Sequence, residues 1–441
     1  MTGVIAYLVG VLIFLVGIGV SIGLHEIGHL WPAKAFGARV SKYMIGFGPT
    51  LWSKKTSQTE YGIKLLPLGG FIAISGMFPP RPAGSEKPKA DGWLRRWVEQ
   101  ARKQQLDQDG NYDQSQAFYR LSIPKRIVVM LGGPTMNLLL GSALILVSLS
   151  GIGGYQAGTR VVQVLPCVFD TYTQTTCTAS DTPSPAAKAG LRSSDKVIAL
   201  NGHPISLWQP VQTQLEQHPA KPVMLTVNRG GKSLQIEILP VVKLRPVYDE
   251  VTGVAKTKSD GSVFLAPKGL LGVQLDYQRA GFGLDHSFRF MGYALTSTAA
   301  MIVDLPRQVG ELAASTFTGG KRSTAGPVSV LGIGNISGNI AENNNLDIPG
   351  KIATWLMILG SLNYALFVFN LLPLLPLDGG HVLSAVLEAV RNGFYRLRGL
   401  PKPGPLDTAR FVPFTMVMWA LLMGLSVLVI VADIVNPISL G

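Results

Sequence analysis

The feature that most constrains this sequence is an uncharged run of 22 residues, Gly3 to Leu24, that leads directly into the motif His25-Glu26-Ile27-Gly28-His29. At about 1.5 Å per helical residue the run reaches about 33 Å, which is enough to cross a hydrocarbon layer of about 30 Å. It lacks a basic start and a small-residue cleavage site, so we interpret it as a retained membrane span and not as a signal peptide. The fold must therefore hold ionisable side chains at the end of a membrane span, where such groups are costly and usually functional.

The H-E-x-x-H spacing predicts a zinc site. On a helix, His25 and His29 face the same way, and each can give one imidazole nitrogen to a single Zn²⁺. In the usual form of the motif the glutamate, here Glu26, is the catalytic general base. A chance match and a satisfied pair of polar histidines are the alternatives. A catalytic zinc site also needs a third protein ligand and an open position.

The composition is that of a membrane protein with a sizeable polar part, with 47% hydrophobic residues and a mean hydropathy of +0.29. Four long uncharged stretches predict four spans: 3–24, 127–159, 352–377 and 411–432. The helix of the second should stop near residue 150, before a Gly-rich segment. Residues 290–303 are too short to span, and residues 323–341 are rich in Gly, Ser and Asn, so a fifth span there is disfavoured.

Basic residues predict the topology. The net charge is +13, and nucleic acid binding is one possible reason. We nevertheless predict no nucleic acid partner, because the distribution of charge is typical of membrane topology: residues 34–126 hold 16 Lys/Arg against 7 Asp/Glu, and residues 391–410 hold five against one. The positive-inside rule places both loops in the cytoplasm, with both termini and residues 151–351 outside. Cys167 and Cys177 then lie on the outer side, where a disulfide and two free thiols are both compatible with the sequence.

The parity of the spans predicts the third ligand. With four spans, the first and third end at the same membrane face. Asp378 follows 26 uncharged residues at the end of the third, so we expect it to meet His25 and His29. Asn370 is a candidate hydrogen-bond donor to substrate or oxyanion. The alternatives are an interfacial helix cap for Asp378 and interhelical packing for Asn370.

Short strands are predicted over residues 39–49, 50–55 and 60–77, directly after the zinc helix. Gly46-Phe47-Gly48 allows close backbone approach, and a strand edge there could pair with an unwound substrate segment. An ordinary interfacial hairpin is the alternative. Residues 79–120 predict a linker followed by a helix with Trp93, Trp97 and Ala101 on one face. This helix would lie either on the inner leaflet of the membrane or in solvent.

Residues 157–276 show strand patterns, and the stretch SPAAKAGLRSSDKVIALNGHPI at 184–205 is similar to PDZ domains of bacterial proteases. Such a domain would bind a peptide or C-terminus at a sheet edge, and a spacer without a ligand is the alternative. Residues 277–349 are amphipathic, with Gly326-Pro327-Val328, and we expect an outer-face helix that packs on the PDZ domain and the membrane surface.

Taken in order, these motifs resemble the site-2 protease family of intramembrane zinc metalloproteases, most closely its bacterial RseP type in a single-PDZ, actinobacterial form. HEIGH at 25–29, Gly132-Gly133-Pro134 with Asn137, and Asn370, Pro373, Asp378 and Gly379 carry the resemblance. It implies zinc bound by His25, His29 and Asp378, catalysis by Glu26, and substrate contact by Asn370. The implied substrates are transmembrane segments of single-span proteins, such as anti-sigma factors or remnant signal peptides.

We therefore predict an α-helical polytopic membrane protein with a membrane-associated β-hairpin region and one extracytoplasmic PDZ domain, in a bacterial cell membrane. The predicted function is intramembrane Zn²⁺-dependent proteolysis, against the alternatives of an inactive PDZ membrane scaffold and of a transporter. The predicted segments are 1–36 (first span with the zinc helix), 37–78 (β region), 79–123 (cytoplasmic linker and insert), 124–152 (second span), 157–276 (PDZ domain), 277–349 (outer amphipathic region), 350–390 (third span with the aspartate motif), 391–409 (cytoplasmic loop) and 410–436 (fourth span).

Overall fold

The computed structural model describes residues 2–80, 93–109, 112–178, 181–318, 326–401 and 403–436, and the chain divides into two compact units. The first, which we call the membrane unit, comprises Met1–Ser148 and Met291–Gly441. The second, the sheet unit, comprises Leu149–Phe290.

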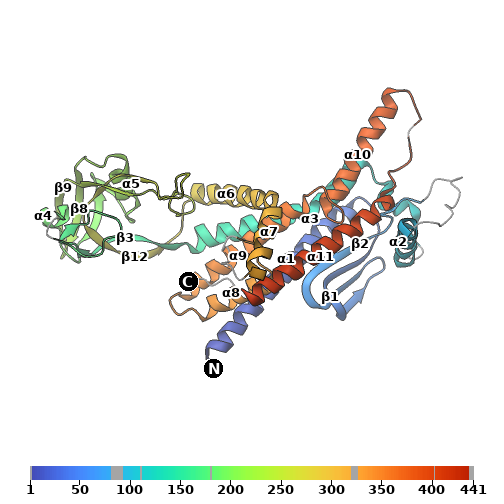
Figure 1. Ribbon diagram of the computed structural model, residues 1–441, viewed down its shortest axis with the longest axis horizontal. Helices are drawn as coiled ribbons and strands as arrows, with labels where there is room; N and C mark the ends of the chain where they lie inside the picture. The colour runs from blue at the N-terminus through green and yellow to red at the C-terminus, as the bar shows by residue number, and fades with distance from the viewer. Residues whose placement is uncertain are drawn as a thin grey trace. The chain divides into compact units, whose positions relative to one another are not determined.

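Long helices dominate the membrane unit (Figure 1). They are α1 (Thr2–Ala35), α2 (Trp93–Asp109), α3 (Ile123–Leu146), α7 (Leu305–Thr318), α8 (Val330–Glu342), α9 (Ile348–Asn370), α10 (Asp378–Leu397) and α11 (Val412–Val435), with short turns η1 (Gln114–Gln116), η2 (Phe118–Arg120) and η4 (Thr408–Phe411). The π-helical turn η3 (Val147–Ile152) and α6 (Leu284–Val303) cross the boundary between the units.

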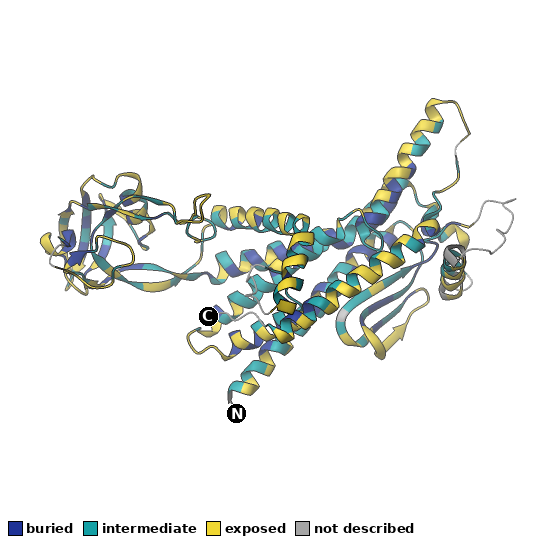
Figure 2. Ribbon diagram, in the orientation of Figure 1, coloured by how far each residue is buried: buried dark blue, intermediate teal, exposed yellow. Residues whose placement is uncertain are grey.

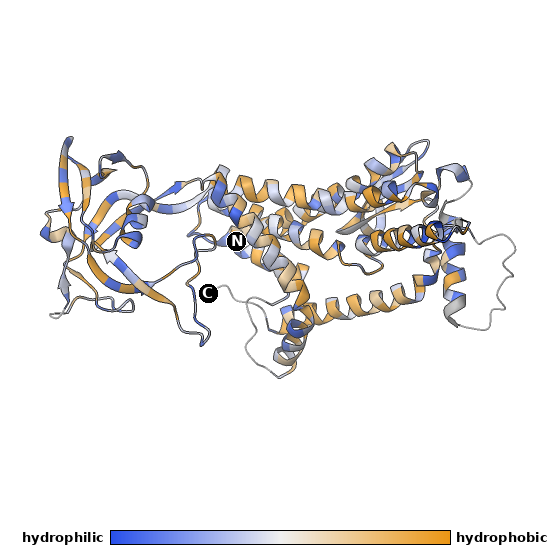
Figure 3. Cartoon of the chain, turned by 90° about the horizontal axis from the view of Figure 1, so that it is seen from above, coloured by the Kyte–Doolittle hydropathy of each residue, from blue (hydrophilic) through white to orange (hydrophobic). Residues whose placement is uncertain are grey.

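Four of the described helices are long and apolar enough to cross a membrane: Gly3–Ala35, Ile123–Ile152, Ile348–Asn370 and Thr408–Val435. The prediction of four candidate spans is confirmed, and the colour of hydrophobic residues predominates along the long helices of the membrane unit in Figure 3. Apolar residues of α11 are largely exposed, among them Trp419 at 51% and Val427 at 56% (Figure 2). Such a surface suits lipid, which has no polar partners to offer.

The first span is central to the packing. Helix α1 contacts α3, α8 and α9, and α3 contacts α9 and α10 (Figure 1). The segment predicted to hold the third span and the aspartate motif, 350–390, contains two helices: α9 ends at Asn370, and α10 begins at Asp378 after an irregular turn. The reason is that Pro373 and Pro376 have no N–H to donate and clash with a continuing helix.

The region between the sheet unit and the third span differs from its prediction. Instead of one surface helix it forms α6, α7 and α8, and α8 packs against α1. The Ser337 hydroxyl donates a hydrogen bond to the Gly10 carbonyl at 2.8 Å. Gly10 allows this approach, since an added Cβ would lie 2.8 Å from the Ala341 methyl. With 13 residues, α8 is too short to span.

A long hairpin follows α1. Strands β1 (Val40–Lys55) and β2 (Glu60–Ile74) pair antiparallel, with repeated register shifts that bend them. The separate strands predicted at 39–49 and 50–55 are therefore one strand. Its first half buries Val40 and Tyr43 against α1, and the Tyr43 hydroxyl donates a hydrogen bond to the Gly23 carbonyl at 2.8 Å. The hairpin is thereby held beside the helix that carries the HEIGH motif.

Residues 81–92, which include most of the predicted linker, lie outside the described residues, and the predicted insert helix is α2. Helix α2 contacts α11 and η4. Its Arg102 pairs with Asp407 and donates to the Pro79 carbonyl at 2.7 Å. Its placement on a membrane surface remains a prediction.

The sheet unit is built on an antiparallel sheet in the order β12-β3-β6-β8-β9, with β7 beside β6. Its strands are β3 (Gly154–Val164), β4 (Cys167–Val168), β5 (Thr182–Pro183), β6 (Lys196–Leu200), β7 (His203–Pro204), β8 (Val223–Arg229), β9 (Lys232–Ile238), β10 (Val241–Pro246), β11 (Leu265–Leu270) and β12 (Val273–Ala280), with helices α4 (Pro185–Lys188) and α5 (Gln209–Gln217). The core includes Val161, Val197, Val211 and Val227, all fully buried. Helix α4 is followed by Gly190, which adopts φ +76°. The assignment as a PDZ domain remains a prediction.

Candidate metal centre

Helix α1 carries both histidines of the HEIGH motif on one face. The imidazole centroids of His25 and His29 lie 4.8 Å apart, with an interplanar angle of 83°. Their Nε2 atoms are 3.2 Å apart, so the two rings point their outer nitrogens at a common position. The spacing of four residues therefore places both imidazoles on one face of the helix, as the sequence predicts.

Asp378 completes a triangle of possible ligand atoms. Its Oδ2 lies 3.4 Å from Nε2 of His25 and 3.3 Å from Nε2 of His29. These three side chains form the one group of at least three His, Cys, Asp or Glu residues, among those the structure describes, that could hold a metal ion. The predicted meeting of the first span with the end of the third is thus present in the structure.

The dimensions of the triangle fit zinc. Ligand atoms about 2.0–2.1 Å from a tetrahedral Zn²⁺ lie about 3.3–3.4 Å from one another. The three observed separations, 3.2, 3.3 and 3.4 Å, match that spacing. The Asp378 Oδ2 atom is buried and has no hydrogen-bond donor among the described residues. A buried acceptor without a donor is costly, so a cation at this position would resolve the arrangement.

The turn before α10 brings Asp378 to this position. Asp378 is the first residue of α10, and the two glycines after it pack against the backbone of the turn. An added Cβ would lie 2.6 Å from the Leu371 carbonyl carbon at Gly379 and 2.5 Å from the Leu375 nitrogen at Gly380. The glycines of the Asp-Gly-Gly sequence therefore allow a close backbone approach that a larger residue would prevent.

Helix α3 supplies partners for the inner nitrogens of both imidazoles. His29 Nδ1 lies 2.7 Å from the Val129 carbonyl oxygen, which can only accept, so Nδ1 carries the proton and Nε2 keeps a free lone pair. His25 Nδ1 lies 3.0 Å from the side-chain amide of Asn137. Such outer contacts fix the orientation and tautomer of metal-binding histidines. Sequence reasoning missed the Val129 contact, because a backbone carbonyl leaves no signal in the residue type.

Glycines let α3 come this close. A Cβ added at Gly132 would lie 2.7 Å from the Gly28 carbonyl carbon, and one added at Gly133 would lie 2.7 Å from Cε1 of both His25 and His29. Gly132 thus permits contact between the two helix backbones, and Gly133 leaves room for the imidazoles. The Gly132-Gly133 pair is the sequence signal that could have located this contact.

Glu26 lies next to the group and is buried, with 8% of its surface exposed. It is within electrostatic range of His25, His29 and Asp378. A Cβ added at Gly70 of β2 would lie 3.3 Å from its Cγ, so the hairpin backbone runs directly beside Glu26. This arrangement places a possible general base between the three possible ligands and a strand.

The predicted substrate-contact residues lie in different elements. Gly46, Phe47 and Gly48 are in β1, where both glycines adopt positive φ, at +94° and +87°. The Phe47 ring covers Gly69 of β2, so that a Cβ there would lie 2.6 Å from its Cζ. Asn370 is the last residue of α9 and is partly exposed.

A separate cavity of about 500 Å³ lies within the sheet unit. Trp208 and Leu215 line it from the α5 side, and Gly272 and Val273 line it from the start of β12. A third part of its wall is a loop closed by a disulfide between Cys167 and Cys177, which settles the alternatives that the sequence leaves open.

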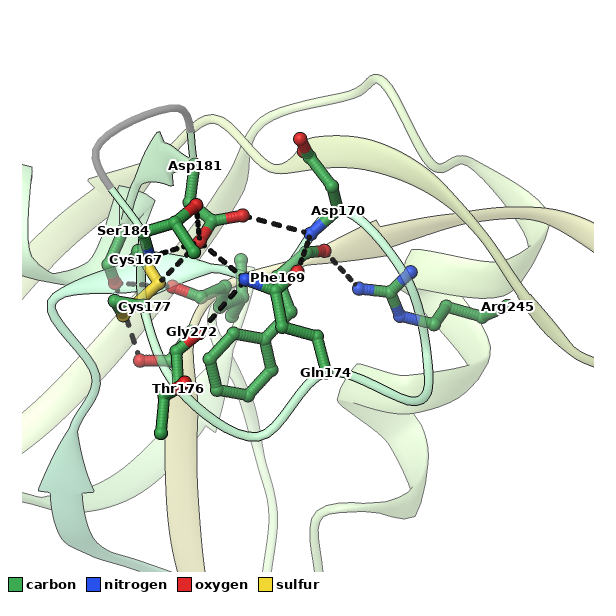
Figure 4. Close-up of a disulfide and its surroundings, with 12 residues drawn as sticks. Cys167, Phe169, Asp170, Gln174, Thr176, Cys177, Asp181, Ser184, Arg245 and Gly272 are labelled. Carbon is green, nitrogen blue, oxygen red and sulfur yellow. Dashed lines mark hydrogen bonds between the residues drawn. A yellow bond between two sulfur atoms is a disulfide. The ribbon is translucent and has the colours of Figure 1, made fainter.

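Figure 4 shows how this disulfide loop is held. The Arg245 guanidinium donates a hydrogen bond to the Phe169 carbonyl at 2.5 Å. The Asp181 carboxylate accepts hydrogen bonds from the Asp170 backbone N–H at 3.2 Å and the Gln174 side chain at 2.6 Å. The loop is therefore fixed at several points and forms an ordered wall of the cavity.

Comparison with known proteins agrees with the metal centre. The sequence pattern of peptidase family M50 matches residues 13–399. The chain is 31% identical to zinc metalloprotease Rip1 of Mycobacterium tuberculosis strain H37Rv, over 98% of this chain and 99% of the relative. It is 30% identical to Rip1 of Mycolicibacterium smegmatis over 98% of each chain. It is 26% identical to zinc metalloprotease RasP of Geobacillus kaustophilus, over 86% of this chain and 89% of the relative.

Proposed function

Because the chain belongs to peptidase family M50, the site-2 proteases, and is a multi-pass membrane zinc metalloprotease, we propose that it hydrolyses peptide bonds within transmembrane segments of single-span proteins. The observation that carries this proposal is the convergence of His25, His29 and Asp378 at the end of the first candidate span. By the positive-inside rule, we propose that this end faces the cytoplasm. A peptidase centre on a membrane helix is within reach of membrane-embedded peptide bonds.

In this proposal His25, His29 and Asp378 hold Zn²⁺. When bound, the zinc would polarise the scissile carbonyl and acidify a water molecule. Glu26 accepts the proton of the attacking water and passes it to the nitrogen of the leaving amine. Its position beside the three ligand atoms, buried yet adjacent to the hairpin, supports this role. Asn370 donates a hydrogen bond to the substrate backbone.

The hairpin provides a place for an extended substrate. A transmembrane helix keeps its carbonyls in internal hydrogen bonds, so it must unwind before a protease can attack it. Among the described strands, β1 and β2 pair only with each other, which leaves an edge for a further strand. Because Gly70 of β2 lies against Glu26, a strand near this part of the hairpin would pass the proposed base. The bend at Gly46-Phe47-Gly48 would shape that edge.

The proposed role of the sheet unit is to select substrates. We propose that the cavity of the sheet unit, as part of a PDZ domain, binds an extended peptide or a C-terminus between α5 and the start of β12. The proposed substrates are proteins such as anti-sigma factors or remnant signal peptides. The proposed topology is that of the positive-inside rule, in a bacterial cell membrane, with 37–123 and 391–409 cytoplasmic and the sheet unit and both termini outside.

The test uses the purified full chain in proteoliposomes, with a single-span model substrate that carries a fluorophore on each side of its span. We expect cleavage within the span by the wild type, none by Glu26→Gln, and retained zinc in that variant, because Glu26 is not a ligand. His25→Ala should lose both zinc and cleavage. Glu311→Gln, which neutralises an exposed carboxylate on α7, is the matched control and should behave as wild type.

Two results would contradict the proposal. Zinc-loaded wild type that cleaves soluble peptides but no membrane span would exclude the substrate class. Full cleavage by Glu26→Gln would exclude its assigned role.

A further inference from the structure

A buried amide contacts the inner nitrogen of His25. Asn137 of α3 is fully buried, and its Nδ2 lies 3.0 Å from His25 Nδ1. The other end of the same amide, Oδ1, is buried without a hydrogen-bond partner among the described residues. His25 Nε2 meanwhile points at His29 and Asp378. Asn137 thus contacts the one ring nitrogen of His25 that faces away from the metal centre.

The chemistry of imidazole decides which end of the amide His25 needs. A neutral imidazole carries one proton, so an Nε2 that gives its lone pair to a metal leaves the proton on Nδ1. That N–H requires an acceptor, and of the two amide ends only Oδ1 can accept. Rotation of the amide by 180° brings Oδ1 onto Nδ1. The same rotation gives the unpartnered oxygen a donor, and the two orientations of an amide differ only in hydrogen bonding.

His29 has the equivalent contact from the backbone. The Val129 carbonyl is an acceptor 2.7 Å from His29 Nδ1, and it lies two helical turns before Asn137 on α3. The same face of α3 therefore offers one acceptor to each imidazole. Only the partner of His25 is a side chain, and so only that partner can be exchanged by substitution.

We infer that Asn137 is a positioning residue that holds His25 in the tautomer and orientation whose Nε2 binds the metal. This inference rests on the proposed role of His25 as a zinc ligand. Asn137 does not touch substrate in this arrangement, because its side chain is fully buried. The contact acts through His25 on metal affinity, and catalysis changes only as a consequence.

The test compares zinc affinity among variants of the full chain in detergent, by competition with a chelator of known affinity. Asn137→Leu has a similar volume but no acceptor, and we expect its affinity for zinc to fall about 10–100-fold, as is typical when the outer partner of a metal-binding histidine is lost. Asn137→Asp keeps an acceptor, and we expect it to retain affinity close to that of wild type. The matched control is Asn363→Leu, since Asn363 is equally buried but bonds Ser21 and not a histidine.

Zinc affinity, thermal stability and cleavage, compared across these variants, distinguish a positioning role of Asn137 from other roles. A purely structural role for Asn137 predicts that Leu and Asp variants both lose thermal stability while zinc affinity is unchanged. A role as hydrogen-bond donor to substrate predicts that Asp abolishes cleavage with zinc fully retained. Either pattern would overturn the inference. If Asn137→Leu does not elute as a folded protein, Asn137→Ala and Asn137→Asp give the same comparison. Absence of zinc from wild type would overturn the proposed function instead.

Discussion

Replacing Gly133 with alanine tests whether helix packing sets the geometry of the metal centre. Gly133 lies on α3, and it is neither a possible ligand nor a possible base. A Cβ atom at this position would lie 2.7 Å from Cε1 of His25 and 2.7 Å from Cε1 of His29, with Nε2 of His29 nearer still. The added methyl group therefore meets both imidazoles at once.

The size of the effect follows from these distances. Carbon atoms in contact prefer about 3.5–4.0 Å, so each ring must move by about 0.8 Å or more to relieve the overlap. Metal sites tolerate deviations of about 0.2 Å in ligand distance. His29 cannot move freely, because its Nδ1 is held 2.7 Å from the Val129 carbonyl. We therefore expect Gly133→Ala to lower zinc affinity by more than about 100-fold, which exceeds the loss of one outer hydrogen bond.

The assay is zinc content and chelator competition on the full chain, with cleavage of the model substrate measured in parallel. Gly424→Ala is the matched control, because it makes the same exchange in the membrane helix α11 at a position with no atom within 4 Å of the added Cβ. It should bind zinc as wild type does and be slightly more stable, since alanine favours helix by about 1 kcal/mol. Wild-type zinc affinity in Gly133→Ala would refute the reasoning.

Two further predictions concern charged groups away from the metal. Arg126 and Glu388 form a buried two-point ion pair between α3 and α10, at 3.1 and 2.6 Å. Arg126→Met should therefore cost about 3–5 kcal/mol of stability, because it leaves a buried charge unpaired, and the double variant Arg126→Met/Glu388→Met should recover most of that loss. Thermal unfolding in detergent measures both variants, and an equal loss of stability in the two would contradict the prediction. In the sheet unit, hydrogen bonds from Arg229 lower the pKa of Asp195, so its stabilising contribution is complete above the ordinary pKa of about 3.9 and is lost as the pH falls through the lowered value. Asp195→Asn should therefore be less stable by about 1–3 kcal/mol at neutral pH, with a gap that narrows below about pH 4; a gap independent of pH would count against this account.

The positions of the possible ligands were predictable from sequence for physical reasons. Helical periodicity alone brings His25 and His29 to one face, and the bilayer restricts the chain to whole crossings, so that the first and third spans end at the same membrane face. These two constraints lead to Asp378 without knowledge of the tertiary structure. Pro373 and Pro376 also indicate the break between α9 and α10, because proline cannot continue a helix.

The contacts around the ligands were not predictable in the same way. Whether Val129 or a neighbour faces His29 depends on the rotation of α3 about its axis, and apolar residues on all sides of a membrane helix leave that rotation unspecified. The path of α8 along α1 depends on small residues, Gly10 and Ser337, and no sequence motif marks the contact between them. Only the packing of the whole unit selects these contacts.

The close approach of α1 and α3 connects the motif, which is readable from sequence, with the packing around the ligands, which is not. Gly28 occupies a variable position of the HEIGH motif, yet an added Cβ there would lie 2.6 Å from the Gly132 carbonyl carbon and 2.9 Å from the Gly133 Cα. A side chain at either Gly28 or Gly132 would force the helix backbones apart by more than about half an ångström, given the ordinary contact distance of about 3.5 Å. The Val129 carbonyl and the Asn137 amide would retreat with α3, and both imidazoles would lose the partners that orient them. The residues between the histidines thus shape the metal centre as much as the histidines do, because they decide how near the second helix can come.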